Sequence, residues 1–239
     1  MNPAETKLNP TALPEGPASF ILSAVSGFVD TAGFILLAGI FTSHITGNLV
    51  LAGAALAGRI DGGVLIRLAL LVVFMAAVAL ASALAFWSNR NGRSVVAVLL
   101  GAETLMLGAF LVTGLALTIQ QQPRDPWVLF TVAGTAVVAM GIQNALMREG
   151  FKTYLPTTMM TGNTTQFTLD GLAMLRGLQS PEIRARFRRT ANVLMGFLIG
   201  AALGAWSAAF LRMWSPIIPL LAIGSLTLFA TQKPAPGNS

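Results

Sequence analysis

The sequence of 239 residues contains no cysteine and a single histidine. The lack of cysteine excludes disulfides and the zinc and iron–sulfur sites that thiolates build. One histidine without cysteine cannot form the common zinc or copper sites, so we expect no metal and no cofactor. Charge is also scarce, because 10% of the residues are charged against about 25% in an average soluble domain. This composition does not suit a protein whose main solvent is water.

Motifs of the common enzymes are missing too. The sequence has no phosphate-binding glycine loop, no Gly-x-Ser-x-Gly turn and no His-Glu-x-x-His pair. An enzyme acting inside the membrane would need a nucleophile and a base that converge, and no strong pair is visible. The net charge of +6 would suit nucleic acid only with a soluble basic face, which is not apparent. We therefore expect neither an enzyme nor a nucleic-acid-binding protein.

Long apolar blocks dominate what is present. Hydrophobic residues make up 54% of the chain, and their uncharged runs match the roughly 17–25 residues that cross a bilayer as a helix. The sequence predicts an all-α membrane protein with about six transmembrane helices, at 18–40, 62–88, 94–118, 127–148, 190–212 and 215–231. Residues 1–17, which are polar and Pro-rich, are expected to form a disordered tail. Residues 119–126 would be a linker, and 232–239 a C-terminal tail.

The charged loops predict an orientation. With a cytoplasmic N-terminus, the six-span arrangement puts all but four of the fifteen Lys and Arg residues inside, the exceptions being Arg59, Arg67, Arg124 and Arg212. This asymmetry follows the positive-inside rule, so both termini are expected to be cytoplasmic. A rival arrangement treats Gly39–Gly58 and Met159–Leu175 as two further spans. Charge hardly separates the two arrangements.

Two segments repeat within the chain. Phe41-Thr-Ser-His-Ile-Thr-Gly-Asn48 and Pro156-Thr-Thr-Met-Met-Thr-Gly-Asn163 end in the same Thr-Gly-Asn, 115 residues apart. Upstream, Gly27-Phe-Val-Asp30 corresponds to Gly141-Ile-Gln-Asn144 at a separation of 114. Two matches at nearly one offset indicate a duplication. Three spans in each half, 18–118 and 127–231, would turn the halves upside down relative to each other and make them inverted repeats.

Thr-Gly-Asn at membrane depth has two interpretations. Gly permits a non-helical backbone, and Thr and Asn can pair with the backbone groups that a broken helix leaves open. Paired half-helices of this kind form the binding sites of inverted-repeat transporters. Alternatively, each element is a tight turn whose Asn caps the next helix. On the first interpretation, Asn48 and 161–163 meet near the bilayer centre, flanked by Asp30 and Asn144.

With these motifs, with Gly53 and with Glu103, the chain resembles the YoaK-type family of bacterial multi-pass membrane proteins, long classed as a domain of unknown function. The resemblance covers nearly all of the chain after residue 17. It implies an inner-membrane location and brings no established substrate or reaction. The second motif of that family often reads Thr-Gly-Thr, so Asn163 is a departure.

Two acids lie within the predicted spans, Asp30 and Glu103. A charged carboxylate there costs at least about 2.5 kcal/mol, so each should face a partner or a cavity, or carry a proton. No Lys or Arg lies in the central part of a span, which leaves neutral partners such as Gln143, Asn144 and His44. Proton coupling is one role for these acids, and a hydrogen-bonded clasp between helices is the other. His44 could relay protons or simply face solvent at a span end.

The site that we predict gathers these residues: Asp30, His44, Thr46, Gly47, Asn48, Glu103, Gln143, Asn144, Thr161, Gly162 and Asn163. It would bind a small polar or ionic solute in a transporter or channel, with proton coupling as one role for its acids. The alternative is a non-transporting scaffold or a lipid-binding subunit.

Two further features favour structural roles. Gly196, Gly200 and Gly204 recur every four residues and form a groove for close helix packing, within the chain or in a homo-oligomer. Residues 180–189 begin with Ser-Pro and contain four arginines, which is typical of a short interfacial helix on anionic membrane lipids.

Overall fold

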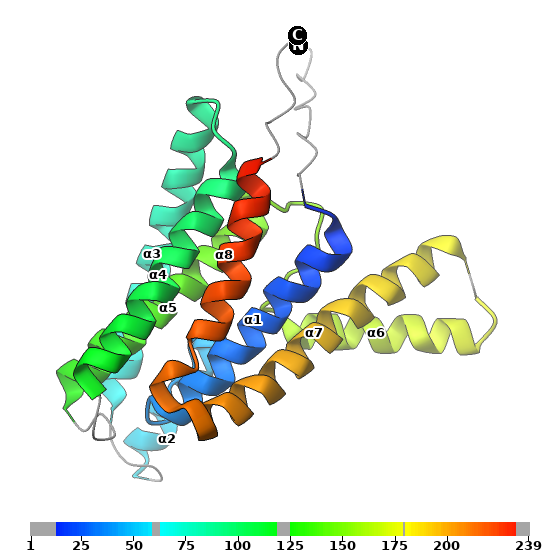
Figure 1. Cartoon of the computed structure of the whole chain (residues 1–239). Coiled ribbons are helices and arrows are strands. Elements are labelled where there is room, and N and C mark those ends of the chain that lie inside the picture. Colours follow the sequence, from blue (N-terminus) through cyan, green and yellow to red (C-terminus); the bar gives the residue numbers. More distant parts are fainter. Residues whose placement is uncertain (1–12, 59–62, 119–124, 179, 233–239) are drawn as a thin grey trace, which may run out of the picture.

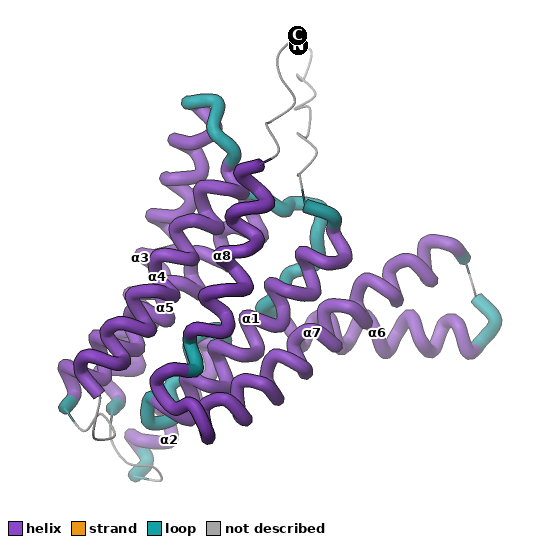
Figure 2. Tube along the Cα trace, viewed as in Figure 1, coloured by secondary structure: helices purple, strands orange, loops and turns teal. Residues whose placement is uncertain are grey.

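A computed structural model describes residues 13–58, 63–118, 125–178 and 180–232, and all regular structure in these ranges is helical (Figures 1 and 2). The predicted all-α class is therefore confirmed. The elements are α1 (Glu15–Leu36), α2 (Ile45–Leu56), α3 (Val64–Arg90), α4 (Val95–Thr118), α5 (Pro126–Glu149), α6 (Met160–Leu175), α7 (Pro181–Leu211), the 3-10 turn η1 (Arg212–Trp214) and α8 (Ile217–Gln232).

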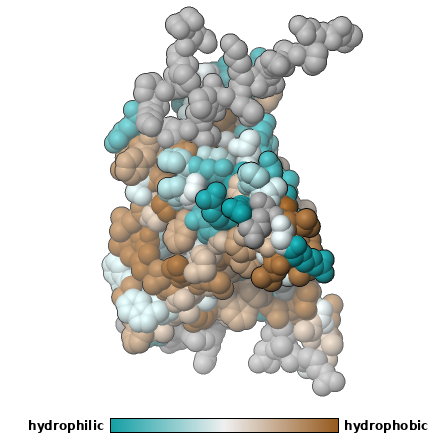
Figure 3. All heavy atoms as spheres, turned by 90° about the vertical axis from the view of Figure 1, so that its right-hand side faces the viewer, coloured by the Kyte–Doolittle hydropathy of each residue, from teal (hydrophilic) through white to brown (hydrophobic). Residues whose placement is uncertain are grey.

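Five of the described helices are long and apolar enough to cross a membrane: α1, α3, α4, α5 and α7. The chain thus has the helices of an integral, multi-pass membrane protein. Six long spans were expected, but α8 has only 16 residues, and α2 with 12 residues is another short apolar helix. Large apolar side chains such as Leu65, Leu80 and Phe210 lie on the outside, where lipid can contact them. Figure 3 shows apolar residues over much of one face, with hydrophilic residues gathered in its upper part.

Several predicted boundaries need correction. Helix α1 begins at Glu15, inside the expected tail, and ends at Leu36 because Ala38 and Gly39 take left-handed backbone angles. The expected separate arginine helix is the beginning of α7, which continues unbroken from Pro181 to Leu211. Pro126, assigned to the linker, starts α5, and Gln232 ends α8. The expected tails at 1–12 and 233–239 and the linker residues 119–124 lie outside the described residues.

Helix α7 packs in parallel along α1. Gly196, Gly200 and Gly204 face the backbone oxygens of Phe20, Ala24 and Phe28, and a Cβ on Gly196 would lie 2.6 Å from the Phe20 oxygen. Such close approach requires glycine. The glycine groove is thus filled by a helix of the same chain, which is the packing within the chain that the sequence analysis offered.

A second close crossing joins α5 to α3, also in parallel. Gly141 of α5 lies against α3, where a Cβ added to it would be 2.8 Å from the Ala77 Cβ and 3.3 Å from the Phe74 oxygen. Ala77, Ala81 and Ala85 recur every four residues on the buried side of α3. The first helix of each half therefore packs on a long helix of the other half.

Helices α4 and α8 run antiparallel. Gly101 lies near Thr227, Thr104 lies near Gly224, and Gly108 lies near Leu220, so one sequence number rises as the other falls. The Thr104 and Thr227 hydroxyls are hydrogen-bonded at 3.0 Å. In Figure 1, α6 and the first part of α7 project sideways from the other helices as a hairpin, which we call the arm (residues 160–191). Stacked Phe167 and Phe187 rings hold the two helices of the arm together.

Candidate functional site

The first Thr-Gly-Asn lies where an irregular loop enters α2. We call residues 37–48 the first junction. Asp30 of α1 is buried against it, and its Oδ1 accepts hydrogen bonds from the backbone N–H groups of Thr42 (2.8 Å), Ser43 (2.8 Å) and His44 (3.3 Å). A carboxylate at the start of a helix also faces the positive end of the helix dipole. Asp30 therefore fixes α2 to the middle of α1.

His44 completes this arrangement. Its Nδ1 lies 2.7 Å from Asp30 Oδ2, and a third of its side chain is exposed. The edge of its ring contacts Phe197 of α7. Ser26 lies on α1 one helical turn before Asp30. Its hydroxyl is hydrogen-bonded to that of Ser43 in the loop at 2.6 Å. Asp30 and His44 thus form a hydrogen-bonded carboxylate–imidazole pair.

Asn48 closes the first junction from the other end. Its Oδ1 accepts from the Phe41 N–H at 2.9 Å, and its Nδ2 donates to the Phe41 carbonyl at 2.8 Å. The Phe41 ring covers Gly47 so closely that a Cβ there would lie 2.7 Å from it. Both polar groups of a loop residue are satisfied by one buried amide, which the loop requires in an apolar setting. Thr46 is exposed.

Arg67 is a residue of the first junction's surroundings that the sequence analysis missed. This buried arginine of α3 donates to the carbonyls of Gly39 at 2.7 Å and Ala38 at 3.2 Å. It holds the left-handed turn that ends α1 and begins the first junction. The sequence analysis counted Arg67 on the outer side, near the start of the predicted span 62–88, and gave it no further role.

The second Thr-Gly-Asn lies at the corresponding place, between α5 and α6. We call residues 150–163 the second junction. Asn144 Oδ1 accepts from the Thr158 hydroxyl at 2.7 Å, where the first half has Asp30. Gln143 is buried and donates to the Leu22 carbonyl at 2.7 Å and to Thr157 Oγ1 at 3.1 Å. The second junction is thus held by neutral groups.

Asn163 repeats only part of what Asn48 does. Its Nδ2 donates to the Pro156 carbonyl at 2.7 Å, seven residues earlier as in the first half. The second hydrogen bond is impossible because proline has no N–H. Neither asparagine is an N-cap, since His44 and Met159 take those positions. The capping interpretation is therefore wrong in detail, although both side chains do stabilise the start of a helix.

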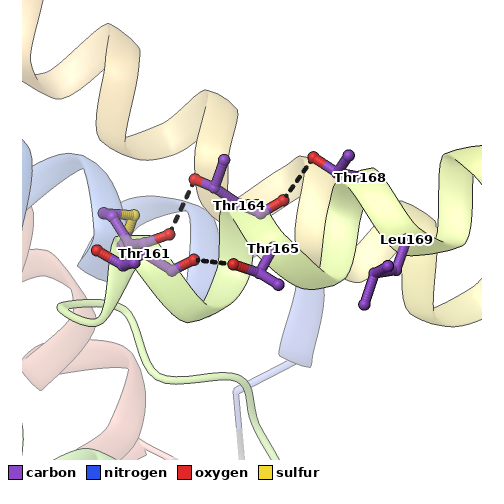
Figure 4. Close-up of a pocket in the computed structure, with 6 residues that line it drawn as sticks. Thr161, Thr164, Thr165, Thr168 and Leu169 are labelled. Atoms are coloured by element: carbon purple, nitrogen blue, oxygen red, sulfur yellow. Dashed lines mark hydrogen bonds between the residues drawn. The ribbon is translucent and has the colours of Figure 1, made fainter.

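A groove of about 540 Å³ runs along the exposed side of α6 (Figure 4). Thr161 of the second motif is the first of four threonines that line it, with Thr164, Thr165 and Thr168. The hydroxyls of the last three donate to carbonyls one turn earlier. Their oxygens remain free to accept, so the groove suits a ligand with donors. Gly162 is exposed nearby, with no atom within 4 Å of an added Cβ.

The predicted shared site does not form. Each asparagine binds its own loop, and Figure 1 shows α2 and α6 well apart. Asp30 and Asn144 accordingly belong to separate junctions. Glu103, the other acid, lies on α4 and is fully buried. Neither of its oxygens has a hydrogen-bond partner among the described residues. A charged carboxylate without a partner is costly in such a setting.

The arm carries an ion pair that the sequence analysis did not predict. Asp170 of α6 is buried and accepts from Arg186 Nε at 2.9 Å and from Gln166 Nε2 at 2.9 Å. These donors lower the pKa of Asp170 below its ordinary value, chiefly through the Arg186 hydrogen bonds. The spacing of 16 residues, spread over two helices, carries no periodic signal in the sequence.

Comparison with known proteins identifies a family for the chain, but that family has no known function. Residues 18–229 match the family described as protein of unknown function DUF1275. Comparisons with curated proteins and with solved structures gave no match.

Proposed function

Because the chain belongs to the DUF1275 family, which has no assigned activity, we propose its function from the two junctions alone. We propose a proton-coupled transporter of a small polar solute rather than an enzyme. The Asp30–His44 pair is the proton site in this proposal. The observation that carries it is the difference between the junctions, in which a titratable pair holds one and neutral Asn144 and Thr158 hold the other.

Proton coupling needs a group that can change charge where the change alters structure. Protonation of Asp30 would weaken three backbone hydrogen bonds at the start of α2 at once. The loosened junction could then move relative to α1. A partly exposed His44 gives the proton a way to reach the buried carboxyl. The groove beside Thr161 is the place we propose for a solute with hydrogen-bond donors.

The transporter proposal includes six spans arranged as inverted repeats, with α2 and α6 as half-helices. Helix directions support this arrangement. In an inverted repeat, equivalent helices of the two halves point in opposite directions, as α4 and α8 do. The two parallel crossings, α1 with α7 and α5 with α3, exchange under the same two-fold relation. Gly27 and Gly141, equivalent in the duplication, each sit at one of them.

The location that we propose is a bacterial inner membrane, with both termini in the cytoplasm. Several arginines support it, because they lie on the side of the N-terminal end of α1. Arg90 and Arg93 flank the turn from α3 to α4, Arg148 ends α5, and Arg189 is paired with Glu15. Positive charge on one side favours that side as cytoplasmic.

Proteoliposomes loaded with a pH-sensitive dye give the test. Amino acids, monosaccharides, short carboxylic acids and inorganic salts are added one class at a time, with and without a pH gradient. One class should move protons in the wild type. Asp30→Asn, which keeps most hydrogen bonds but removes the charge, should abolish that movement.

Asp125→Asn is the matched control. Asp125 also accepts a backbone N–H at a helix start, from Trp127 at 2.8 Å, but it lies outside both junctions. Transport by this variant should equal that of the wild type. Equal proton movement by wild type and Asp30→Asn would refute the proton site. If no class of solute moves protons in the wild type, the result favours the alternative, a non-transporting scaffold. The glycine-packed contact of α1 with α7 also suits a scaffold.

A further inference from the structure

A second cavity lies between the start of α1, Leu155 of the second junction, and α7. Its volume of about 250 Å³ corresponds to about eight water molecules. Arg188 and Arg189 line one side, Ser19 and Gly16 line another, and Leu155 adds an apolar wall. The cavity plays no part in the proposed transport.

Ser19 is the most informative residue of this cavity. Its side chain is 3% exposed, and its hydroxyl has no hydrogen-bond partner among the described residues. A buried hydroxyl without a partner is destabilising, because it has lost its hydrogen bonds to water. A ligand oxygen in the cavity would supply the missing partner. The start of α1 adds a positive helix end, because no side chain caps it.

The charges favour an anion. Arg188 and Arg189 contribute two positive charges, and Glu15 contributes one negative charge. Arg189 Nη1 lies 3.6 Å from Glu15 Oε1, which is too long for a hydrogen bond, so the guanidinium keeps its donors for another acceptor. Asn192 is occupied, since its Nδ2 donates to the Gly16 carbonyl at 2.8 Å.

We propose that this cavity binds the phosphate group of an anionic phospholipid. Two guanidinium groups, a free hydroxyl and a helix start are the donors that a phosphate with several acceptor oxygens requires. The site lies at the start of the apolar helix α1, beside residues 188–193 of α7, and lipid headgroups are found at the ends of membrane-spanning helices. Leu155 and Val193 provide apolar surface for the glycerol part of the lipid. The inference goes beyond the proposed transport function and does not depend on it.

The test uses the full-length protein in detergent and three probes: dioctanoylphosphatidylglycerol, dioctanoylglycerol and inorganic phosphate. Binding is followed by the thermal unfolding temperature and by titration. Dioctanoylphosphatidylglycerol should raise the unfolding temperature saturably, and dioctanoylglycerol should not. Arg188→Gln and Arg189→Gln should each raise the Kd about tenfold or more. Glu15→Gln should lower the Kd, because it removes the opposing charge.

Two further variants separate binding from folding. Ser19→Ala should raise the Kd severalfold without lowering the unfolding temperature in the absence of lipid, because it removes a buried hydroxyl that has no partner among the described residues. Arg93→Gln removes an equal charge on the α3–α4 turn, outside the cavity, and should bind like the wild type. Equal binding of dioctanoylglycerol, or wild-type binding by both Arg188→Gln and Arg189→Gln, would overturn the proposal. Competition by inorganic phosphate at similar concentration would identify a free phosphate, rather than a lipid, as the source of the same chemistry.

Discussion

The first and second junctions use the same backbone device with different side chains. In both, an asparagine in the first turn of a short helix binds the residue seven positions before it. In both, a side chain from the preceding long helix reaches the loop. The first junction has a carboxylate, an imidazole and an asparagine that makes two hydrogen bonds to its loop. The second has an amide, a threonine and an asparagine that makes one.

This difference separates what the architecture needs from what one half adds. Closing the loop needs one amide and one acceptor, because an unpaired backbone group is costly away from water. It does not need a charge, since the second junction closes without one. The Asp30–His44 pair thus gives the first junction an ionisable contact that the second junction lacks, and the proposed proton site rests on this difference.

The largest expected effect is the loss of stability when the duplicated glycines, Gly27 and Gly141, are replaced by alanine. A Cβ on Gly27 would overlap the Phe197 carbonyl oxygen, whereas one on Gly141 would meet the Ala77 Cβ at 2.8 Å. Gly27→Ala should cost more than about 3 kcal/mol and Gly141→Ala about 1–3 kcal/mol, because the added Cβ overlaps its nearest neighbour more deeply at Gly27 than at Gly141. Unfolding in detergent with increasing dodecyl sulfate measures both. Gly134→Ala, with no neighbour within 4 Å, is the control, and equal losses at Gly27 and Gly141 would contradict the contrast.

The next largest loss of stability is expected at the two junction asparagines, Asn48 and Asn163. Asn48→Ala leaves two polar groups of Phe41 unpaired and should cost about 2–4 kcal/mol, whereas Asn163→Ala leaves one and should cost about 1–2 kcal/mol. Asn91→Ala is the control, because the exposed Asn91 bonds only to Trp87, and it should change stability by less than about 0.5 kcal/mol. The same unfolding assay applies. A larger loss for Asn163→Ala than for Asn48→Ala would show that hydrogen-bond number does not decide the order.

Pro156→Ala would make the second junction more like the first. The new N–H can donate to Asn163 Oδ1, as Phe41 does to Asn48. In a double-mutant cycle, the cost of Asn163→Ala should rise by about 1 kcal/mol in the Pro156→Ala background. An unchanged cost would mean that the missing N–H does not explain the difference between the asparagines.

The smallest effect concerns the arm, where the second half keeps its ion pair. Because Arg186 lowers the pKa of Asp170, this pair stabilises the protein at neutral pH. The stabilisation should be lost as the pH falls through the ordinary carboxyl range towards the lower folded pKa. The unfolding temperature of Asp170→Asn should therefore lie slightly below that of the wild type near pH 7 and approach it in acid. A constant difference across this range would exclude the ion pair as its cause.

Local features were predictable from the sequence, and distant pairings were not. Long apolar runs placed α3, α4 and α5 within a few residues, because a bilayer span leaves a strong compositional signal. The duplicated Thr-Gly-Asn marked both junctions. Nothing in those runs indicated that α1 packs on α7, because any small-residue groove fits any close helix.

The failure at the candidate site has a similar cause. From the sequence, we predicted that polar groups at membrane depth in the two halves would contact each other in one site. Asn48 and Asn163 instead find partners only seven residues away, which cost less entropy to bring together. Gln143, in contrast, reaches Leu22 across 121 residues, a contact that no local pattern announces.

The pairing of α1 with α7 has a consequence for biosynthesis. Asn192 and Gly16, which contact each other, are 176 residues apart in the chain. At about 5–20 residues per second, the ribosome needs roughly 10–35 seconds to make the segment between them. Throughout that interval the newly inserted first helix has no partner for its tightest contact surface. The nascent chain must therefore hold this helix in the bilayer, or beside the insertion machinery, until nearly the whole protein has been made.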